Sequence, residues 1–245
     1  MSGLRTNFSR LAMFTLLALL FQPDCRAGAA DTAWEWHRKD LSPAGALAVG
    51  IAYGGGLFVA VGNSGAIYTS GDGAAWNPRA SGTNALLEDA VYGSGQFIAV
   101  GAGGTTLASK DGTAWRSEDA GTRADLHGIA YGRDTFVTVG DHGVILTSPD
   151  GKAWRVEDSG TRQVLQKIAY GKKKFVAVGL NGTILVSPDG RTWRVEPAPA
   201  LAHLNSVAYG NGIFVAVGEA IFTSTDGTAW TEIGPRTNRR LNGIA

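Results

Sequence analysis

Arginine, aspartate and histidine side chains that break an otherwise regular sequence are the first candidates for chemistry. Arg123 and Arg162 lie 39 residues apart in the matching segments DAGTRA and DSGTRQ, and Arg236 lies in a later segment of the same kind. Guanidinium groups hold carboxylates through paired hydrogen bonds, so these arginines predict a site for a carboxylate or an acidic peptide. The alternative is that they are solvated and balanced by nearby acidic residues: Glu118, Asp119, Glu157 and Asp158.

Asp141 and His142 form an adjacent acidic and basic pair in another variable segment, and we count them as candidate binding residues. No nucleophile accompanies them in the sequence, so we predict no catalytic residues. The histidines follow no metal-ligand spacing, and we therefore predict no metal site and no cofactor. They are His37, His127, His142 and His203.

A repeat of about 39 residues must position these side chains. Five complete units are marked by tyrosines at Tyr53, Tyr92, Tyr131, Tyr170 and Tyr209, and by tryptophans at Trp76, Trp115, Trp154, Trp193 and Trp230. Because the aromatic positions recur so strictly, we expect them to fill the spaces between units rather than to stack on sugars. A further segment, Leu241–Ala245, matches the start of a unit, and Asp31–Arg38 matches the end of one.

Each unit divides into four short strands, which in the third unit are expected at residues 126–131, 135–139, 144–148 and 153–157. Glycine-containing turns such as Asp150-Gly151 separate them. The second strand reads FVAVG or close to it in every unit, so it is apolar on both faces and must be covered on both. Four-stranded sheets that cover one another in series indicate an all-β fold, a β-propeller. A linear β-solenoid is the alternative.

The strand count predicts a ring larger than five blades. The fifth unit already has its own fourth strand, so Asp31–Arg38 would duplicate it in a five-bladed ring, and Leu241–Ala245 begins another blade. We therefore expect five complete blades plus partial ones, six or more in the natural ring, with residues 30–245 a C-terminally truncated propeller domain. The alternative is that Leu241–Ala245 is a tail on a five-bladed ring.

The variable segments are expected to meet at one end of the ring. In a propeller, the loop after the second strand and the loop after the fourth strand lie at the same end, which we call the front face. Arg123, Arg162 and Arg236 fall in loops of the second kind, and Asp141 and His142 in a loop of the first kind. The opposite end, the back face, carries a Lys172–Lys174 turn that we expect to be solvated, with contact to phosphate or to an acidic surface as the alternative.

The pattern S-x-D-G-x-x-W follows the third strand of every unit. An aspartate in such a turn bonds the backbone amides of its own turn, which predicts a structural role for Asp72, Asp111, Asp150, Asp189 and Asp226. The pattern resembles the Asp-box, or BNR, repeat of sialidases, sortilin-type receptors and Ycf48-like photosystem II assembly factors. Those repeats usually have one more residue between Asp and Gly. The resemblance spans the five units and implies the propeller fold, but such turns are structural in unrelated families.

The first 29 residues are predicted to be a signal peptide. Arg5 and Arg10 precede an apolar core at residues 11–21, and Ala27-Gly28-Ala29 gives a cleavage pattern. The core is too short to span a bilayer, so no stable membrane insertion is expected after cleavage; an uncleaved anchor is the alternative. Cleavage changes the net charge from +1 to −1 and removes Cys25, the only cysteine. We therefore expect a secreted or periplasmic protein without disulfides and without a nucleic-acid footprint.

These observations favour an exported, non-enzymatic β-propeller that binds a protein or a glycan through its front face. The resemblance implies two alternatives, a glycoside hydrolase of sialidase type and a Ycf48-like photosystem assembly factor. A sialidase-like site needs three arginines, a Tyr/Glu nucleophile pair and an acid/base Asp, and the loops supply no Tyr/Glu pair. Other carboxylate pairs for glycoside hydrolysis stay open, because their separation is not readable from sequence.

Overall fold

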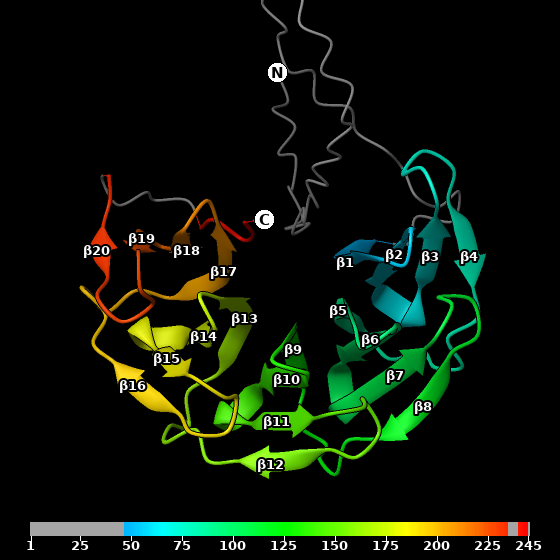
Figure 1. Ribbon diagram of the computed structural model, residues 1–245, viewed down its shortest axis with the longest axis horizontal. Helices are drawn as coiled ribbons and strands as arrows, with labels where there is room; N and C mark the ends of the chain where they lie inside the picture. The colour runs from blue at the N-terminus through cyan, green and yellow to red at the C-terminus, as the bar shows by residue number, and fades with distance from the viewer. Residues whose placement is uncertain (1–46, 235–239, 245) are drawn as a thin grey trace, which may run out of the picture.

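The computed structural model describes residues 47–234 and 240–244. Its strands form five four-stranded antiparallel sheets, arranged one after another around an axis like the blades of a propeller (Figure 1). The predicted all-β propeller with five complete blades is therefore confirmed. The predicted signal peptide, the segment Asp31–Arg38 and Arg236 lie outside the described residues.

Within each blade, strands that follow one another in sequence lie side by side. The inner strands, nearest the axis, are β1 (Ala48–Gly54), β5 (Leu87–Gly93), β9 (Leu126–Gly132), β13 (Leu165–Gly171) and β17 (Leu204–Gly210). The second strands are β2 (Leu57–Gly62), β6 (Gln96–Gly101), β10 (Thr135–Gly140), β14 (Lys174–Gly179) and β18 (Ile213–Gly218). The third strands are β3 (Ile67–Ser70), β7 (Thr105–Ser109), β11 (Ile145–Ser148), β15 (Ile184–Ser187) and β19 (Ile221–Ser224). The outer strands are β4 (Asn77–Arg79), β8 (Arg116–Asp119), β12 (Arg155–Glu157), β16 (Arg194–Glu196) and β20 (Thr231–Glu232).

The observed strands match those expected for the third unit to within two residues. The largest difference is at β12, which begins at Arg155 rather than at residue 153. The reason is the preceding turn, in which Asp150 holds the backbone of Lys152 and Ala153 through hydrogen bonds and keeps these residues out of the ladder.

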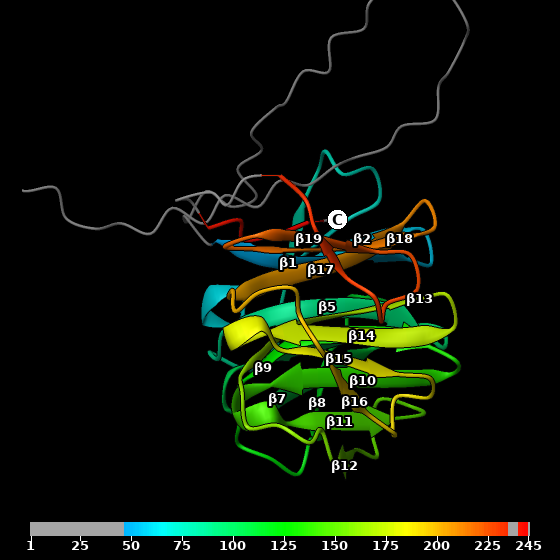
Figure 2. The same cartoon turned by 90° about the vertical axis from the view of Figure 1, so that its left-hand side faces the viewer.

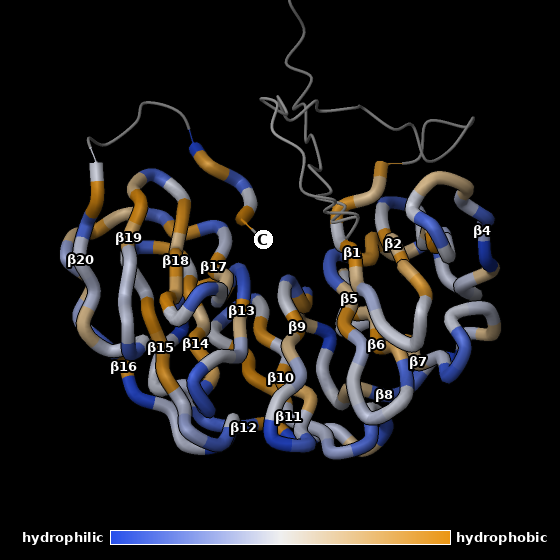
Figure 3. The backbone as a smooth tube through the Cα atoms, turned by 45° about the horizontal axis from the view of Figure 1, so that its top comes forward, coloured by the Kyte–Doolittle hydropathy of each residue, from blue (hydrophilic) through white to orange (hydrophobic). Residues whose placement is uncertain are grey.

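The hydrophobic core is a series of layers between blades. Four apolar clusters are found in the described part, and each joins two neighbouring blades: first with second, second with third, third with fourth, and fourth with fifth. The second strands supply both sides of these layers, and in β6 every residue is buried. Many hydrophobic residues accordingly lie on the strands (orange in Figure 3). The expectation that the second strand is covered on both faces is confirmed for β6, β10 and β14, whereas in β18 Ile213 is exposed and Val215 is only partly buried.

A tyrosine ring lies on a glycine at every contact between neighbouring inner strands. Each inner strand ends in Tyr-Gly, and the ring of the following blade covers that glycine. A Cβ added at Gly54, for example, would lie 2.0 Å from the Tyr92 ring, and one added at Gly132 would lie 2.3 Å from the Tyr170 ring. Only glycine therefore lets the blades approach this closely, which explains why Tyr-Gly recurs in the sequence.

The described chain ends beside the fifth blade. Leu241–Ile244 runs along β17, where the Leu241 N–H donates to the Gly218 carbonyl at 2.9 Å and the Asn205 side-chain amide donates to the Leu241 carbonyl at 2.9 Å. The first and fifth blades are not adjacent in the arc of sheets (Figure 1).

Candidate functional site

The front face is built from short 3₁₀ turns between the second and third strands. They are η1 (Asn63–Gly65), η2 (Ala102–Gly104), η3 (Asp141–Gly143) and η4 (Leu180–Gly182). The turns gather along one side of the molecule, where the inner strands also begin (Figure 2). In each turn the middle residue has a left-handed backbone, with φ of 56° at both His142 and Asn181. These turns hold the variable side chains at the front face.

The second residue of every inner strand sits at a β-bulge. In β9, Leu126 pairs with Gly140 and Gly128 pairs with Val139, which leaves His127 as the extra residue. Bulges bend a strand and re-aim a side chain, and they are frequent next to functional sites. We call the five bulge residues the bulge row: Val49, Glu88, His127, Gln166 and Asn205. The row is where the inner strands stop repeating, and four of its members are polar.

His127 joins two carboxylates at the centre of the row. Its Nδ1 lies 3.1 Å from Glu88 Oε2 and its Nε2 lies 2.9 Å from Asp141 Oδ1. The imidazole is 13% exposed, whereas the Glu88 and Asp141 side chains are 26% and 33% exposed. Burial lowers the pKa of His127, but the hydrogen bonds to Glu88 and Asp141 and the negative charges of both outweigh it and raise that pKa to about 9. At neutral pH the imidazole is therefore a cation held between two anions.

An ion pair next to the bulge row spans three blades. Lys167 Nζ of the fourth blade lies 2.8 Å from Asp89 Oδ1 of the second blade. The matching position of the third blade is Gly128, so no side chain stands between them. Asp89 is 6% exposed in its side chain and also accepts a hydrogen bond of 2.9 Å from the Ile129 N–H. A buried carboxylate with two partners is well compensated, and it ties the three blades together at the axis.

Polar contacts continue along the front face of the fourth and fifth blades. His203 Nδ1 accepts from the Asn181 N–H at 3.1 Å, and the His203 N–H donates to Glu219 Oε2 at 3.0 Å. Arg240 Nη2 lies 3.2 Å from Glu219 Oε1. The His203 backbone N–H, more than the nearby charges of His203 and Arg240, lowers the pKa of Glu219. The front face therefore carries polar or charged contacts from the second to the fifth blade.

The residues expected to bind from sequence are only partly brought together. Asp141 contacts His127 rather than its neighbour His142, which is exposed and has no partner among the described residues. Arg123 and Arg162 lie exposed in the loops after β8 and β12, and neither forms a hydrogen bond or ion pair within residues 47–234 and 240–244. Both guanidinium groups are thus available to a ligand.

Sequence reasoning missed the bulge row and the ion pair beside it, namely Glu88, Asp89, His127 and Lys167. The available signal was variation at the second and third positions of an inner strand whose other positions repeat. His127 was weighed only as a metal ligand, and a regular strand would turn Glu88, Asp89 and Lys167 toward the neighbouring blades. The bulge re-aims the side chain at the second position.

The aspartates of the S-x-D-G-x-x-W turns serve their own hairpins. Asp72 Oδ1 accepts from the backbone N–H groups of Ala74 and Ala75 at 2.8 and 2.9 Å, and from the Ser70 hydroxyl at 3.0 Å. The Ala75 and Ala74 N–H groups and this hydroxyl lower the pKa of Asp72. Backbone N–H groups lower the pKa of the other four as well. At Asp189 burial is the largest single effect and raises the pKa, but the Thr192 and Arg191 N–H groups together with the Ser187 and Thr192 hydroxyls outweigh it. The Oδ1 atom of each of these carboxylates therefore serves its own turn.

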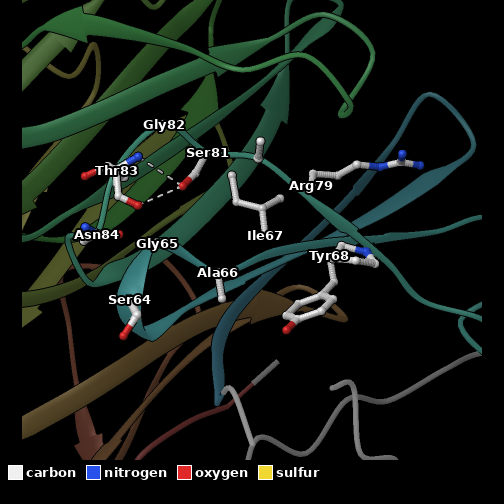
Figure 4. A pocket seen from close by; sticks show the side chains of 12 residues that line it. Ser64, Gly65, Ala66, Ile67, Tyr68, Arg79, Ser81, Gly82, Thr83 and Asn84 are labelled. Atoms are coloured by element: carbon white, nitrogen blue, oxygen red, sulfur yellow. Dashed lines mark hydrogen bonds between the residues drawn. The ribbon is translucent and has the colours of Figure 1, made fainter. Parts of the chain in front are cut away.

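A surface hollow of about 390 Å³ lies on the first blade, beside the turn η1 and the strands β3 and β4 (Figure 4). Its polar atoms are largely used internally. The Ser81 hydroxyl donates to the Thr83 carbonyl at 3.1 Å and accepts from the Thr83 N–H at 3.3 Å. Arg79, which belongs to β4, donates to Thr69 Oγ1 at 2.9 Å. The hollow contains none of the residues predicted to bind.

The charged side chains of the bulge row are held mainly by one another. His127 is fixed by two hydrogen bonds, and no serine, cysteine or threonine accompanies it in the bulge row. Within the described ranges, no group of three or more histidine, cysteine or acidic side chains is placed to hold a metal ion. Among these residues there is also no helix long and apolar enough to cross a membrane.

Comparisons with known proteins identify the fold. No protein-family model matches the chain, and no curated protein sequence matches it. Ycf48 bound to a D1 peptide is a similar solved structure, with a TM-score of 0.61 and 18% identity over 80% of this chain and 67% of that one. Ycf48 from Cyanidioschyzon merolae gives 0.55 and 14% over 75% and 70%, and the WD40 propeller domain of Doa1 gives 0.62 and 15% over 80% and 71%. These likenesses establish a β-propeller repeat fold, and the Asp-box assignment stays a prediction.

Proposed function

We propose that this chain is an exported, non-enzymatic scaffold that binds a segment of a partner protein across its front face. The observation that carries the proposal is the bulge row, where the repeat gives way to charged side chains at the axis end of adjacent blades. The exposed Arg123 and Arg162 lie in the loops that lead into β9 and β13, two of the strands that carry this row. A segment with both acidic and basic side chains would find partners in the arginines and in Glu88 and Asp141.

A protein segment is favoured over a glycan by the placement of the aromatic rings. Sugar-binding sites commonly stack rings on aromatic side chains, but the repeated tyrosines stand at the back-face ends of the inner strands and the tryptophans in back-face turns. The described front-face loops contain no tyrosine, phenylalanine or tryptophan. The solved complex of a fold neighbour, Ycf48, with a D1 peptide also supports a peptide ligand. A photosystem assembly role is a narrower form of this proposal and rests on that fold likeness.

A selection experiment tests the proposal without a known partner. A library of random peptides displayed on phage is selected against the immobilised chain, and the affinities of the enriched peptides are measured by calorimetry. We expect the variants Glu88→Gln and Arg123→Ala/Arg162→Ala to weaken binding at least about tenfold, as loss of a charged partner does at interfaces. The matched control is Lys173→Gln, an exposed back-face residue, which should leave the affinity unchanged.

Three results would contradict the proposal. One is binding that survives the front-face changes and is lost in Lys173→Gln. Another is a glycan array with ligands that depend on Glu88 when no peptide is enriched, which would support the glycan alternative. The third is turnover of a fluorogenic sialoside that Glu88→Gln abolishes, which would support the enzyme alternative.

Export is proposed from the sequence of residues 1–29. Expression with the native leader, followed by fractionation and N-terminal sequencing, tests it. We expect the mature chain outside the cytoplasm, beginning at Ala30. Recovery of the uncleaved chain in the membrane fraction would support the anchor alternative.

A further inference from the structure

The outward face of the fifth blade differs from the same face of the other four. A Cβ added at Gly210 meets nothing within 4 Å, whereas one added at Gly171 would lie 2.2 Å from the Tyr209 ring. Gly210 is also exposed, unlike Gly93, Gly132 and Gly171. The fifth blade therefore offers the glycine half of the tyrosine–glycine contact without its tyrosine.

This face also lacks one side of a second repeated contact, in which an Asp-Gly turn covers a valine or isoleucine of the second strand. In the other blades the valine or isoleucine of the second strand is fully buried, as at Val59, Ile98, Val137 and Val176. The Asp-Gly turn of the following blade covers that side chain; a Cβ on Gly190, for instance, would lie 2.8 Å from Val137 Cγ2. Val215 has the matching position in the fifth blade and is only half-buried, and Ile213 is 37% exposed.

These positions border a hollow of about 220 Å³ on the fifth blade. It is lined by Ala208, Tyr209, Gly210, Asn211, Ile213, Val215 and Ile244. A tyrosine from the next blade would lie on Gly210 at this place, and an Asp-Gly turn would lie on Val215. We call the hollow and its two uncovered positions the sixth-blade seat.

Leu241–Ile244 already lies where the inner strand of a sixth blade belongs. The Ile244 N–H donates to Ser206 Oγ at 3.3 Å. The same two positions are joined between the second and third blades, where the Ile129 N–H donates to Asp89 Oδ2 at 2.9 Å. The contact of Ile244 therefore matches an internal blade contact in register.

We propose that the outward face of the fifth blade is a docking surface for one more blade of the same repeat, which takes Leu241–Ile244 as the start of its inner strand. The recognition chemistry follows from the four internal contacts: a tyrosine ring on Gly210 and an Asp-Gly turn on Val215. The first blade shows the other half of the tyrosine–glycine contact. Among the described residues no glycine of another blade lies under the Tyr53 ring, which is 61% exposed.

A second copy of the chain fits this seat poorly. Its inner strand β1 would need the place that Leu241–Ile244 holds beside β17. Because blades follow one another around the axis, its four remaining blades would also turn into the space of the first copy's own first blades (Figure 1). The occupant is therefore a blade joined to Leu241–Ile244 and not a second ring.

A graft tests the proposal. A copy of residues 131–157, which begins with the tyrosine and ends with the outer strand, is joined after Ala245. We expect the melting temperature to rise by about 5 °C, since the blade covers apolar surface of the fifth blade. We also expect the grafted segment to resist limited proteolysis and the protein to remain monomeric in size-exclusion chromatography with light scattering.

Two variants make the graft specific to the seat. Gly210→Val should abolish the gain in the grafted chain, because a side chain there occupies the place of the tyrosine ring, yet should leave the ungrafted chain's melting temperature nearly unchanged. The graft that carries Tyr131→Ala in its copied segment should lose most of the gain. A graft that is rapidly digested without raising the melting temperature would overturn the proposal. A dimer of the ungrafted chain that Gly210→Val dissociates would overturn it in favour of a second copy.

Discussion

The contacts between blades use the same residues in every repeat, whereas the bulge row at the axis uses a different residue in each. Between blades, the same tyrosine covers the same glycine at four successive contacts, and every copy has the same partners. In the bulge row, Val49, Glu88, His127, Gln166 and Asn205 occupy one structural position with five different side chains. The repeated residues hold the blades together, and our proposal assigns recognition to the residues that fail to repeat.

The largest expected effect separates an internal tyrosine from the terminal one. Tyr131→Ala should lower the free energy of unfolding by about 3 kcal/mol, because it removes a ring that lies on Gly93 and pairs with Phe136 at 4.6 Å. Tyr53→Ala should cost about 1 kcal/mol or less, because that ring is 61% exposed and its stacking partner is Phe58. Urea denaturation of both variants measures the difference. Equal costs would mean that the tyrosine–glycine contacts do not hold the blades together.

Two glycines with the same sequence context are expected to respond with opposite signs. Gly132→Ala should destabilise the chain by about 2 kcal/mol, because the added methyl group would lie 2.3 Å from the Tyr170 ring. Gly210→Ala should leave stability unchanged or raise it by about 0.5 kcal/mol, because that site is open and alanine restricts the unfolded chain. Thermal unfolding of the pair checks the sign. A destabilised Gly210→Ala would contradict the open face of the fifth blade.

The bulge row should make stability depend on pH in the alkaline range. The pKa of His127 is about 9 in the folded chain and near 6.5 when unfolded, so its contribution is fully present below about pH 6.5 and is lost as pH rises through 9. We expect the free energy of unfolding to fall by about 2 kcal/mol over that window, since part of the interaction is screened by solvent. His127→Gln is the matched variant and should flatten the profile. An unchanged slope in His127→Gln would show that the imidazole is not held as a cation.

The smallest expected effect concerns a turn aspartate. Asp150→Ala should lower the free energy of unfolding by about 1 kcal/mol, because the Lys152 and Ala153 N–H groups lose their acceptor. Asp150→Asn keeps an acceptor oxygen and should cost less. The Lys152 and Ala153 N–H groups also lower the pKa of Asp150, so its contribution is present above about pH 4 and is lost as pH falls further. A peptide affinity altered by Asp150→Asn would contradict a purely structural role for this turn.

The strands and turns that repeat could be predicted from the sequence. The side-chain contacts among the residues that do not repeat could mostly not be predicted. The aromatic spacing and the two-sided FVAVG strands led to the blades, because burial of these positions depends on local pattern and on neighbours of the same kind. The pairing of Asp141 with His127 was not predictable, because it depends on a bulge that a regular alternation of side chains does not reveal. The Asp89–Lys167 ion pair was missed because it skips a blade over Gly128, a contact no local pattern encodes.

Hydrogen–deuterium exchange in the presence of a selected peptide tests directly whether the front face binds. We expect slower exchange on binding at the front face, in residues 123–128, 141–143 and 162–167, and no change at the back-face turn Lys172–Lys173. Slower exchange confined to the back face, or spread evenly over all blades, would contradict the assignment of recognition to the bulge row.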